Sequence, residues 1–259
     1  QLVKNGMTDA VIFDPKARNV LPAAILYKKN ILALRGSFRP VTKVNMDMYK
    51  ESLKMFLEEN KVDAENTLVL FEITLSNLRS DGEIDERDFM DRAELLCSLG
   101  QTVMISNFQE YYRVVEYFAK YTKARMGLAM GVNNLVDIFD EKYYDNLPGG
   151  LLEAFGRGFG HNVKLYVYPA INVDSGELYG LNNIKLPENL TGLLTYMQAN
   201  DKIAAIPEYN ERLLHILSDD VLSKIKAGAA SWEDDVPYEV VQAIKFFELF
   251  GYQKKAVLN

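Results

Sequence analysis

The middle of the chain alternates between short apolar runs and longer segments of helical periodicity, and this alternation limits the fold more than any other feature. Three apolar runs have the length and composition of buried strands, at residues 66–75, 102–107 and 126–132. Amphipathic segments follow them, at residues 86–100, 110–122 and 133–144. Strands that are apolar on both faces and joined by helices belong to parallel sheets with right-handed crossovers. The pattern therefore predicts an α/β fold with a Rossmann-like three-layer parallel sheet, and a barrel-like (βα) arrangement is the alternative.

The flanking segments extend this pattern. Residues 9–14 and 163–170 predict further strands, and residues 45–60 predict a helix with one apolar stripe. Residues 22–38 are ambiguous, and they favour a short helix or strand that turns into a second strand at the motif ILALRG. These segments place further strands and helices on both sides of the central alternation.

The last part of the chain is dominated by helical patterns, which begin at Pro187. We therefore expect a Rossmann-like α/β domain at residues 1–186 and a helical C-terminal block at residues 187–259, packed together as one structural unit. The chain starts at Gln1 without a methionine and soon enters an apolar run. This start suggests a fragment or processed product, in which case part of the function lies in a missing N-terminal region.

Composition and charge disfavour several classes of function. The formal net charge of −7 disfavours nucleic acids and anionic membranes, whose phosphates attract basic surfaces. No apolar run approaches the roughly 18 residues of a membrane span. The single cysteine, Cys97, rules out an internal disulfide and suits a reducing compartment, so we expect a cytoplasmic protein. With only His161 and His215, the chain lacks the ligands of a His-rich zinc site.

Small polar residues lie where the predicted strands end, and ligands of open parallel sheets bind beyond the carboxyl ends of the strands. These residues are Thr74, Asn77, Ser106, Asn107 and Asn133, with Asn134 beside the last. Serine and asparagine also cap helices and form Asx turns, which is the structural alternative for each of them. As a cluster they predict a nearby site in which Thr74, Asn77, Ser106, Asn107 and Asn133 orient a ligand.

Glu72 stands out because it interrupts the apolar run LVLFEITL. A carboxylate buried there needs a partner, since an unpaired buried charge is strongly unfavourable. One interpretation makes Glu72 a catalytic acid or base that contacts the ligand. The other makes it half of a structural ion pair with a basic residue.

The stretch LRGSFRPVTKVNMDM offers such basic residues. Arg35, Arg39 and Lys43 are spaced four apart around a glycine and a proline, just before the helix that is expected to begin near Asn45. Arginine binds phosphate and carboxylate groups in a bidentate manner, and a helix N-terminus adds N–H donors. The stretch therefore predicts an anion clamp, and the alternative is a salt-bridge patch that pairs with Glu72 or with acidic helices.

The run TLVLFEITLSNL, followed by TVMISN, resembles the first two motifs of the haloacid-dehalogenase-like phosphohydrolases. In this resemblance, over residues 66–107, Glu72 and Thr74 stand where that superfamily has two aspartates, and Ser106 stands at the second motif. The run MGLAMGV ends without the acidic pair that holds Mg²⁺ in the superfamily. The resemblance implies a Rossmann-like topology rather than a working phosphatase.

The motifs RGSFRPVTKVNMDM and EKYYDNLPGGLLEAFGR resemble an uncharacterised bacterial family that carries the label nicotinate-nucleotide adenylyltransferase. The resemblance covers more of the chain and implies nucleotide chemistry. The H-x-G-H motif that cradles ATP phosphates in those transferases is absent from this sequence.

Two functions remain open at this point. The first is an enzyme, or part of one, that binds a small phosphorylated or nucleotide-like anion, with Mg²⁺ as the one cofactor kept open and no protein metal site. The second is a catalytically silent Rossmann-like module for dimerisation, as a homodimer, or for regulation of a missing N-terminal region. An open pocket shared by the basic stretch and the strand ends would favour the enzyme. Basic side chains already occupied by Glu72 and surface acids would favour the module.

Overall fold

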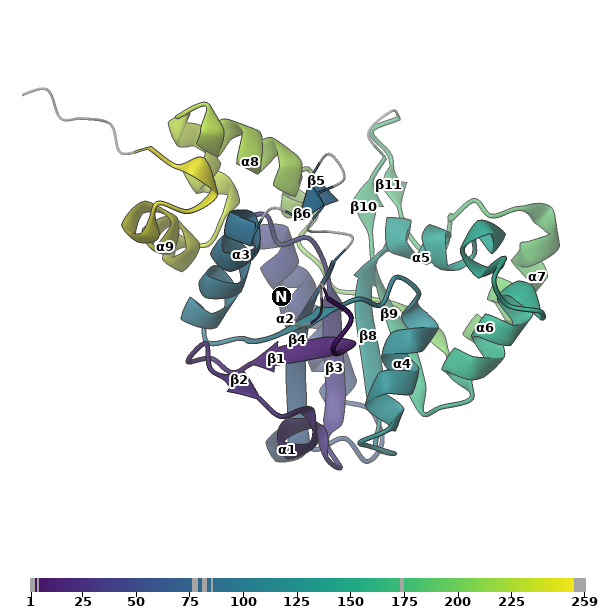
Figure 1. Ribbon diagram of the computed structural model, residues 1–259. Coiled ribbons are helices and arrows are strands. Elements are labelled where there is room, and N and C mark those ends of the chain that lie inside the picture. Colours follow the sequence, from purple (N-terminus) through teal and green to yellow (C-terminus); the bar gives the residue numbers. More distant parts are fainter. Residues whose placement is uncertain are drawn as a thin grey trace, which may run out of the picture.

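A computed structural model describes residue 3 and residues 5–75, 79–80, 83–84, 86–172 and 175–253 of the chain. An eight-stranded mixed sheet lies between two layers of helices (Figure 1). The strands of this sheet are β1 (Ala10–Phe13), β2 (Asn19–Val20), β3 (Asn30–Arg35), β4 (Thr67–Thr74), β7 (Thr102–Ser106), β8 (Met126–Gly131), β9 (Val163–Tyr168) and β12 (Ile203–Ala205). Two small hairpins pair β5 (Arg79–Ser80) with β6 (Glu83–Ile84) and β10 (Ala170–Ile171) with β11 (Leu178–Tyr179).

The order of the strands identifies the fold. Across the sheet they lie as β12-β9-β8-β3-β4-β7-β1-β2. Six of them, from β12 to β7, pair in parallel, whereas β1 runs antiparallel to both β7 and β2. Numbered along the chain, the six parallel strands lie in the order 3-2-1-4-5-6, which is the order of a doubly wound Rossmann sheet. The predicted Rossmann-like α/β fold is confirmed, and the barrel alternative is wrong because β12 and β2 are open edges.

The helices cover both faces of the sheet, as a parallel sheet requires. They are α1 (Pro22–Leu26), α2 (Lys43–Leu57), α3 (Glu86–Ser98), α4 (Tyr111–Ala119), α5 (Val132–Ile138), α6 (Gly150–Phe159), α7 (Glu188–Ala199), α8 (Ser218–Lys226) and α9 (Tyr238–Phe247). Helices α2, α3, α8 and α9 share one buried apolar cluster with the sheet, and α1, α4, α5, α6 and α7 share the other. Successive residues of β3 alternate between these clusters, so Ile31 and Leu32 are both fully buried. This explains the unbroken apolar run of the strand.

The C-terminal block contributes to the same core as the sheet. Val221 and Ile225 of α8, Trp232, and Ile244 of α9 are buried in the cluster that also contains Leu32 of β3. Strand β12 was not expected from the sequence, because its three residues follow Pro187 in a region of helical patterns. Among the described residues, no helix combines the length and the apolar character that crossing a membrane would need.

Candidate functional site

A pocket of about 620 Å³ opens where the strand order reverses. After β3 the chain continues to β4 on one side, and after β7 it crosses to β8 on the other side of β3. Residues at the carboxyl ends of these strands line the pocket, among them Arg35 of β3, Thr74 of β4 and Gly131 of β8. In doubly wound sheets, the crevice at this reversal point is where ligands bind.

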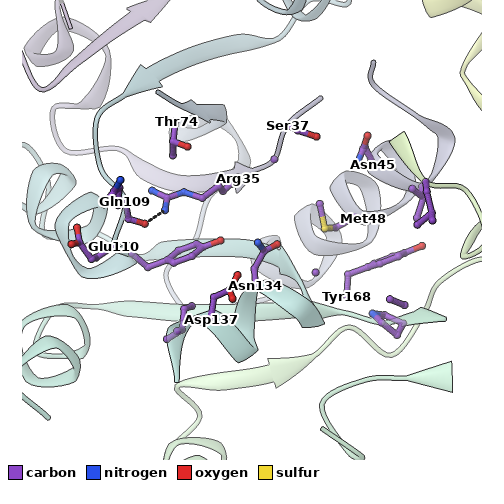
Figure 2. A pocket seen from close by; sticks show the side chains of 18 of the residues that line it. Arg35, Ser37, Asn45, Met48, Thr74, Gln109, Glu110, Asn134, Asp137 and Tyr168 are labelled. Atoms are coloured by element: carbon purple, nitrogen blue, oxygen red, sulfur yellow. Dashed lines mark hydrogen bonds between the residues drawn. The ribbon is translucent and has the colours of Figure 1, made fainter. Parts of the chain in front are cut away.

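The pocket has a polar side and an apolar side. The polar lining includes Arg35, Ser37, Asn45, Thr74, Gln109, Glu110, Tyr111, Asn134 and Asp137. The apolar lining includes Met48, Tyr168, Pro169, Ala170, Leu214, Ile216 and Leu217. In Figure 2, Gln109 and Glu110 lie toward one end of the pocket, and Met48 and Tyr168 lie toward the other. A ligand with one polar and one apolar end would match this division.

The turn from β3 into α2 sets the shape of one wall. A Cβ atom on Gly36 would lie 2.9 Å from Cζ of Phe38, so the ring of Phe38 leaves room only for glycine. Thr42 caps α2: its Oγ1 accepts a hydrogen bond from the Asn45 N–H at 3.4 Å, and Asn45 Oδ1 accepts one from the Thr42 N–H at 2.9 Å. This capping box begins the helix beside the pocket, where Val44, Asn45 and Met48 contribute to the lining.

Arg35 forms a buried ion pair with Glu72 at the base of the pocket. Its Nε and Nη2 donate to the two carboxylate oxygens of Glu72 at 2.9 Å each, and its Nη1 donates to the Gln109 carbonyl at 2.9 Å. Ser106 Oγ donates to Glu72 Oε1 at 2.6 Å. The guanidinium carbon also lies 4.2 Å from the ring centroid of Tyr111. The structure therefore places Arg35 in the pocket lining but commits its guanidinium to protein groups.

The other two basic residues of the predicted clamp do not line the pocket. Arg39 Nε donates to Asp88 Oδ1 of α3 at 2.6 Å, and Lys43 Nζ donates to the Asp234 carbonyl at 2.6 Å. The three basic side chains thus diverge to different partners. Their four-residue spacing does not bring them together, because Gly36 and Pro40 turn the chain between them.

The predicted strand-end residues are only partly gathered at the pocket. Thr74 lines it, whereas Ser106 is buried beneath it against Glu72. Asn107 lies outside the lining, and its N–H donates to the Asp9 carbonyl at 3.0 Å. Asn133 is exposed on α5 and does not line the pocket, although its neighbour Asn134 does. Asn77 lies outside the described residues.

Most residues of the polar side were not predicted from the sequence. Gln109, Glu110 and Tyr111 follow β7 as the chain enters α4, and Asp137 lies on α5 one turn after Asn134. The spacing of Asn134 and Asp137 is a usable signal, because residues three apart on a helix share one face. The apolar residues from the segment before α8 gave no signal, since nothing local indicates that they reach the sheet.

The electrostatics of the pocket are not those of an anion clamp. Its charged lining residues are Arg35, Glu110 and Asp137. The charge of Arg35 is balanced by Glu72. The Oε2 atom of Glu110 lies 3.6 Å from Nη1 of Arg113. Burial raises the pKa of the Asp137 carboxyl above its ordinary value and raises the pKa of Tyr111 to about 12. The lining therefore offers hydrogen-bond acceptors and aromatic rings, and its one cation is already paired.

Neither His161 nor His215 belongs to the lining, although Leu214 and Ile216 on either side of His215 do. Within the described ranges, no group of three or more His, Cys, Asp and Glu side chains could hold a metal ion. The paired histidines of an H-x-G-H signature thus have no counterpart in the described pocket.

Comparisons with known proteins bear on the fold. No protein-family model and no curated protein matches the chain. The chain is similar in structure to Plasmodium falciparum nicotinic acid mononucleotide adenylyltransferase complexed with APC, at 14% identity and a TM-score of 0.51 over 87% of this chain and 98% of that chain. For the same enzyme complexed with NaAD, the identity is 13% and the TM-score 0.49 over the same shares. A Vibrio parahaemolyticus protein described as a nicotinate-nucleotide adenylyltransferase matches at 13% identity and a TM-score of 0.37, over 86% of this chain and 95% of that chain.

The similarity to the enzyme complexed with APC supports the Rossmann-like fold. At 14% identity it carries the fold alone. It gives no support to the haloacid-dehalogenase-like resemblance at residues 66–107 or to a bacterial origin. The geometry also speaks against that resemblance, because Glu72 is 1% exposed and is bound by Arg35 and Ser106 rather than open to a substrate.

Proposed function

We propose that the pocket at the reversal point binds a nucleotide. The observation that carries this proposal is an open pocket of about 620 Å³ at the carboxyl ends of β3, β4 and β8, beside the start of α2. The first N–H groups of an α-helix have no partner within the helix, and they favour a phosphate. The phosphate would therefore lie toward Ser37 and the start of α2.

The two sides of the pocket suit the two parts of a nucleoside. A base would pack against Met48, Tyr168 and Leu217 on the apolar side. Ribose hydroxyls would donate hydrogen bonds to the carboxylates of Glu110 and Asp137, which accept but do not donate when ionised.

A nucleotide-binding module without catalysis is the second candidate, and two observations favour it. Arg35, Arg39 and Lys43 are all bonded to protein groups. Neither histidine belongs to the pocket lining. In this proposal Glu72 has a structural role, so no acid or base is assigned to it. The protein would then sense or hold a nucleotide and pass that state to a partner or to another part of the polypeptide.

Isothermal titration of the purified chain with adenosine, AMP and ATP, with and without Mg²⁺, tests the binding. Gly131→Leu is the test variant: the backbone at Gly131 has φ −71° and ψ 155°, and a Cβ there would meet only Asn134 Oδ1, at 3.8 Å. The leucine would occupy the pocket without straining the fold, so we expect affinity to fall by about tenfold or more. Gly192→Leu, at an open glycine on α7, is the matched control. Equal affinity of both variants and the native chain would contradict the proposal.

Turnover separates the two candidates. The chain is incubated with ATP, Mg²⁺ and nicotinate mononucleotide, and released pyrophosphate is measured. Adenylyl transfer would join the AMP part of ATP to the mononucleotide and release one pyrophosphate for each dinucleotide formed. Nucleotide binding without pyrophosphate release supports the silent module. Pyrophosphate release that Gly131→Leu abolishes supports an enzyme that works without the paired histidines.

A further inference from the structure

The opposite end of the parallel strands, where β3 and β8 begin, carries a cluster of lysines that lack acidic partners. Lys28, in the turn before β3, and Lys120 and Lys123, at the end of α4, line a groove of about 370 Å³ with Tyr27 and Tyr121. None of its eight lining residues is acidic. Within the described part of the chain, none of these three lysines lies within ion-pair distance of a carboxylate, and they stand out on a protein of net charge −7.

The groove is built by contacts between segments that are distant in sequence. The Lys28 N–H donates to the Tyr121 carbonyl at 3.2 Å, and Thr122 Oγ1 donates to the Lys29 carbonyl at 2.8 Å. These bonds fix the turn before β3 against the end of α4. The lysines therefore flank a preformed hollow rather than lying on separate loops.

The end of α4 explains only part of this cluster. Cations near a helix C-terminus interact favourably with its dipole, and Lys123 Nζ donates to the Ala119 carbonyl at 3.3 Å. An ammonium group has three donors, so Lys123 keeps two for a ligand. Lys28 belongs to the other wall and has no such explanation. Its φ of 57° is a left-handed conformation that favours glycine or asparagine, so the backbone does not account for a lysine at this position.

We propose that this groove is a second ligand site, which binds a molecule that carries both a phosphate group and an aromatic ring, as a mononucleotide does. Lysines bind phosphates as compact point charges. Tyr27 is 61% exposed beside them, with the Lys28 Nζ 5.1 Å from its ring centroid, and its ring can stack on a ligand. The site is separate from the pocket at the reversal point, because its residues lie where β3 and β8 begin, whereas that pocket lies where they end. The anion site expected at Arg35, Arg39 and Lys43 is thus assigned to a different set of cations.

Backbone amide NMR of the ¹⁵N-labelled chain, titrated with inorganic pyrophosphate, tests the phosphate part. We expect saturable shifts at residues 27–29 and 119–124. The triple variant Lys28→Ala/Lys120→Ala/Lys123→Ala should weaken binding by about tenfold or more. The control Lys16→Ala/Lys185→Ala/Lys226→Ala removes the same charge at exposed lysines elsewhere and should leave binding unchanged. Absence of shifts, or equal weakening in both triple variants, would overturn the site.

Two further variants keep the result independent of folding defects and of the proposed nucleotide pocket. Lys28→Gly relieves the left-handed backbone, so we expect a higher melting temperature together with weaker pyrophosphate binding, a combination that a purely structural lysine would not give. Tyr27→Ala in the Gly131→Leu background should weaken AMP binding and leave pyrophosphate binding unchanged. If AMP shifts amides only around the reversal-point pocket of the native chain, the second site fails while the proposed function stands. If AMP shifts amides only around the groove, the proposed nucleotide pocket fails while the second site stands.

Discussion

Replacing Arg35 and Glu72 by methionine, singly and together, tests whether Arg35 serves the fold or a ligand. The Arg35 side chain is 7% exposed and that of Glu72 is 1% exposed, so each single substitution leaves the other charge buried without its partner. Breaking a buried ion pair in this way reduces the free energy of unfolding by about 3–5 kcal/mol. The two losses would sum to about 6–10 kcal/mol if they were independent.

The double variant should lose less than this sum, because it removes both charges. The groups left behind are the Ser106 hydroxyl and the Gln109 carbonyl, which each lose one hydrogen-bond partner. At about 1–3 kcal/mol for each group, the double variant should be about 2–6 kcal/mol less stable than the native chain. The expected coupling energy between Arg35 and Glu72 is therefore about 4 kcal/mol.

Urea unfolding at neutral pH, followed by the fluorescence of the buried Trp232, measures all four proteins. The reasoning is refuted if either single substitution lowers stability by less than about 1 kcal/mol, or if the two losses are additive. In that case the ion pair would not hold Arg35. A loss of ligand binding in Arg35→Met at unchanged stability would then restore the arginine as an anion-binding residue.

Three shorter predictions concern the glycines of β8, the pocket carboxylate and the buried tyrosines. Gly127→Ala should lower the free energy of unfolding by about 1–3 kcal/mol, because the new Cβ would lie 2.8 Å from two aromatic rings. Gly131→Ala should raise the free energy of unfolding by about 0.4–1 kcal/mol. Equal effects of the two substitutions in urea unfolding would contradict both predictions. Asp137→Asn should stabilise the chain at neutral pH, because burial raises the pKa of the Asp137 carboxyl in the folded state. The native chain therefore loses stability as pH rises from the unfolded-state pKa of 3.8 through the folded-state pKa. A gain in stability from the substitution that persists below the unfolded-state pKa would argue against this cause. Burial raises the pKa of Tyr111 to about 12 and raises the pKa values of Tyr117, Tyr144, Tyr166 and Tyr168, so stability should fall as pH rises above 10. The part of the phenolate absorbance that comes from these five tyrosines should appear together with unfolding rather than before it.

Much of the fold follows from patterns that are local in sequence. Strands β4, β7 and β8 appear where apolar runs predicted them, because a strand buried on both faces has to be apolar throughout. Strand β12 escaped prediction because three residues are too few to show a period. The antiparallel direction of β1 likewise cannot be predicted from its four residues, because it depends on which edge of the sheet the segment reaches.

The candidate site was less predictable, for reasons of register and distance. Arg35 and Glu72 pair because they are opposite each other in the β3–β4 register, and no pattern within either strand determines that register. The sequence therefore indicated two alternatives for Arg35, an anion clamp or an ion pair with Glu72, but it did not distinguish between them. Glu110 and Asp137 were missed for a related reason, because they reach the pocket only through the directions of α4 and α5. Motifs that carry their own geometry are predictable, whereas sites assembled from several strand ends are not.

The lining of the reversal-point pocket spans most of the polypeptide, from Arg35 to Leu217, and this has a consequence for synthesis on the ribosome. The parallel strands from β3 to β9 can emerge and begin to pair before the segment that carries Leu214, Ile216 and Leu217 exists. Chains are made at about 5–20 residues per second and fold from the N-terminus, so a nascent chain passes through a period in which the sheet is present and one wall of the pocket is missing. A nucleotide that needs this wall would bind only after the C-terminal block has docked on the sheet. Nucleotide binding by nascent chains stalled at increasing lengths would therefore show when this last step of folding occurs.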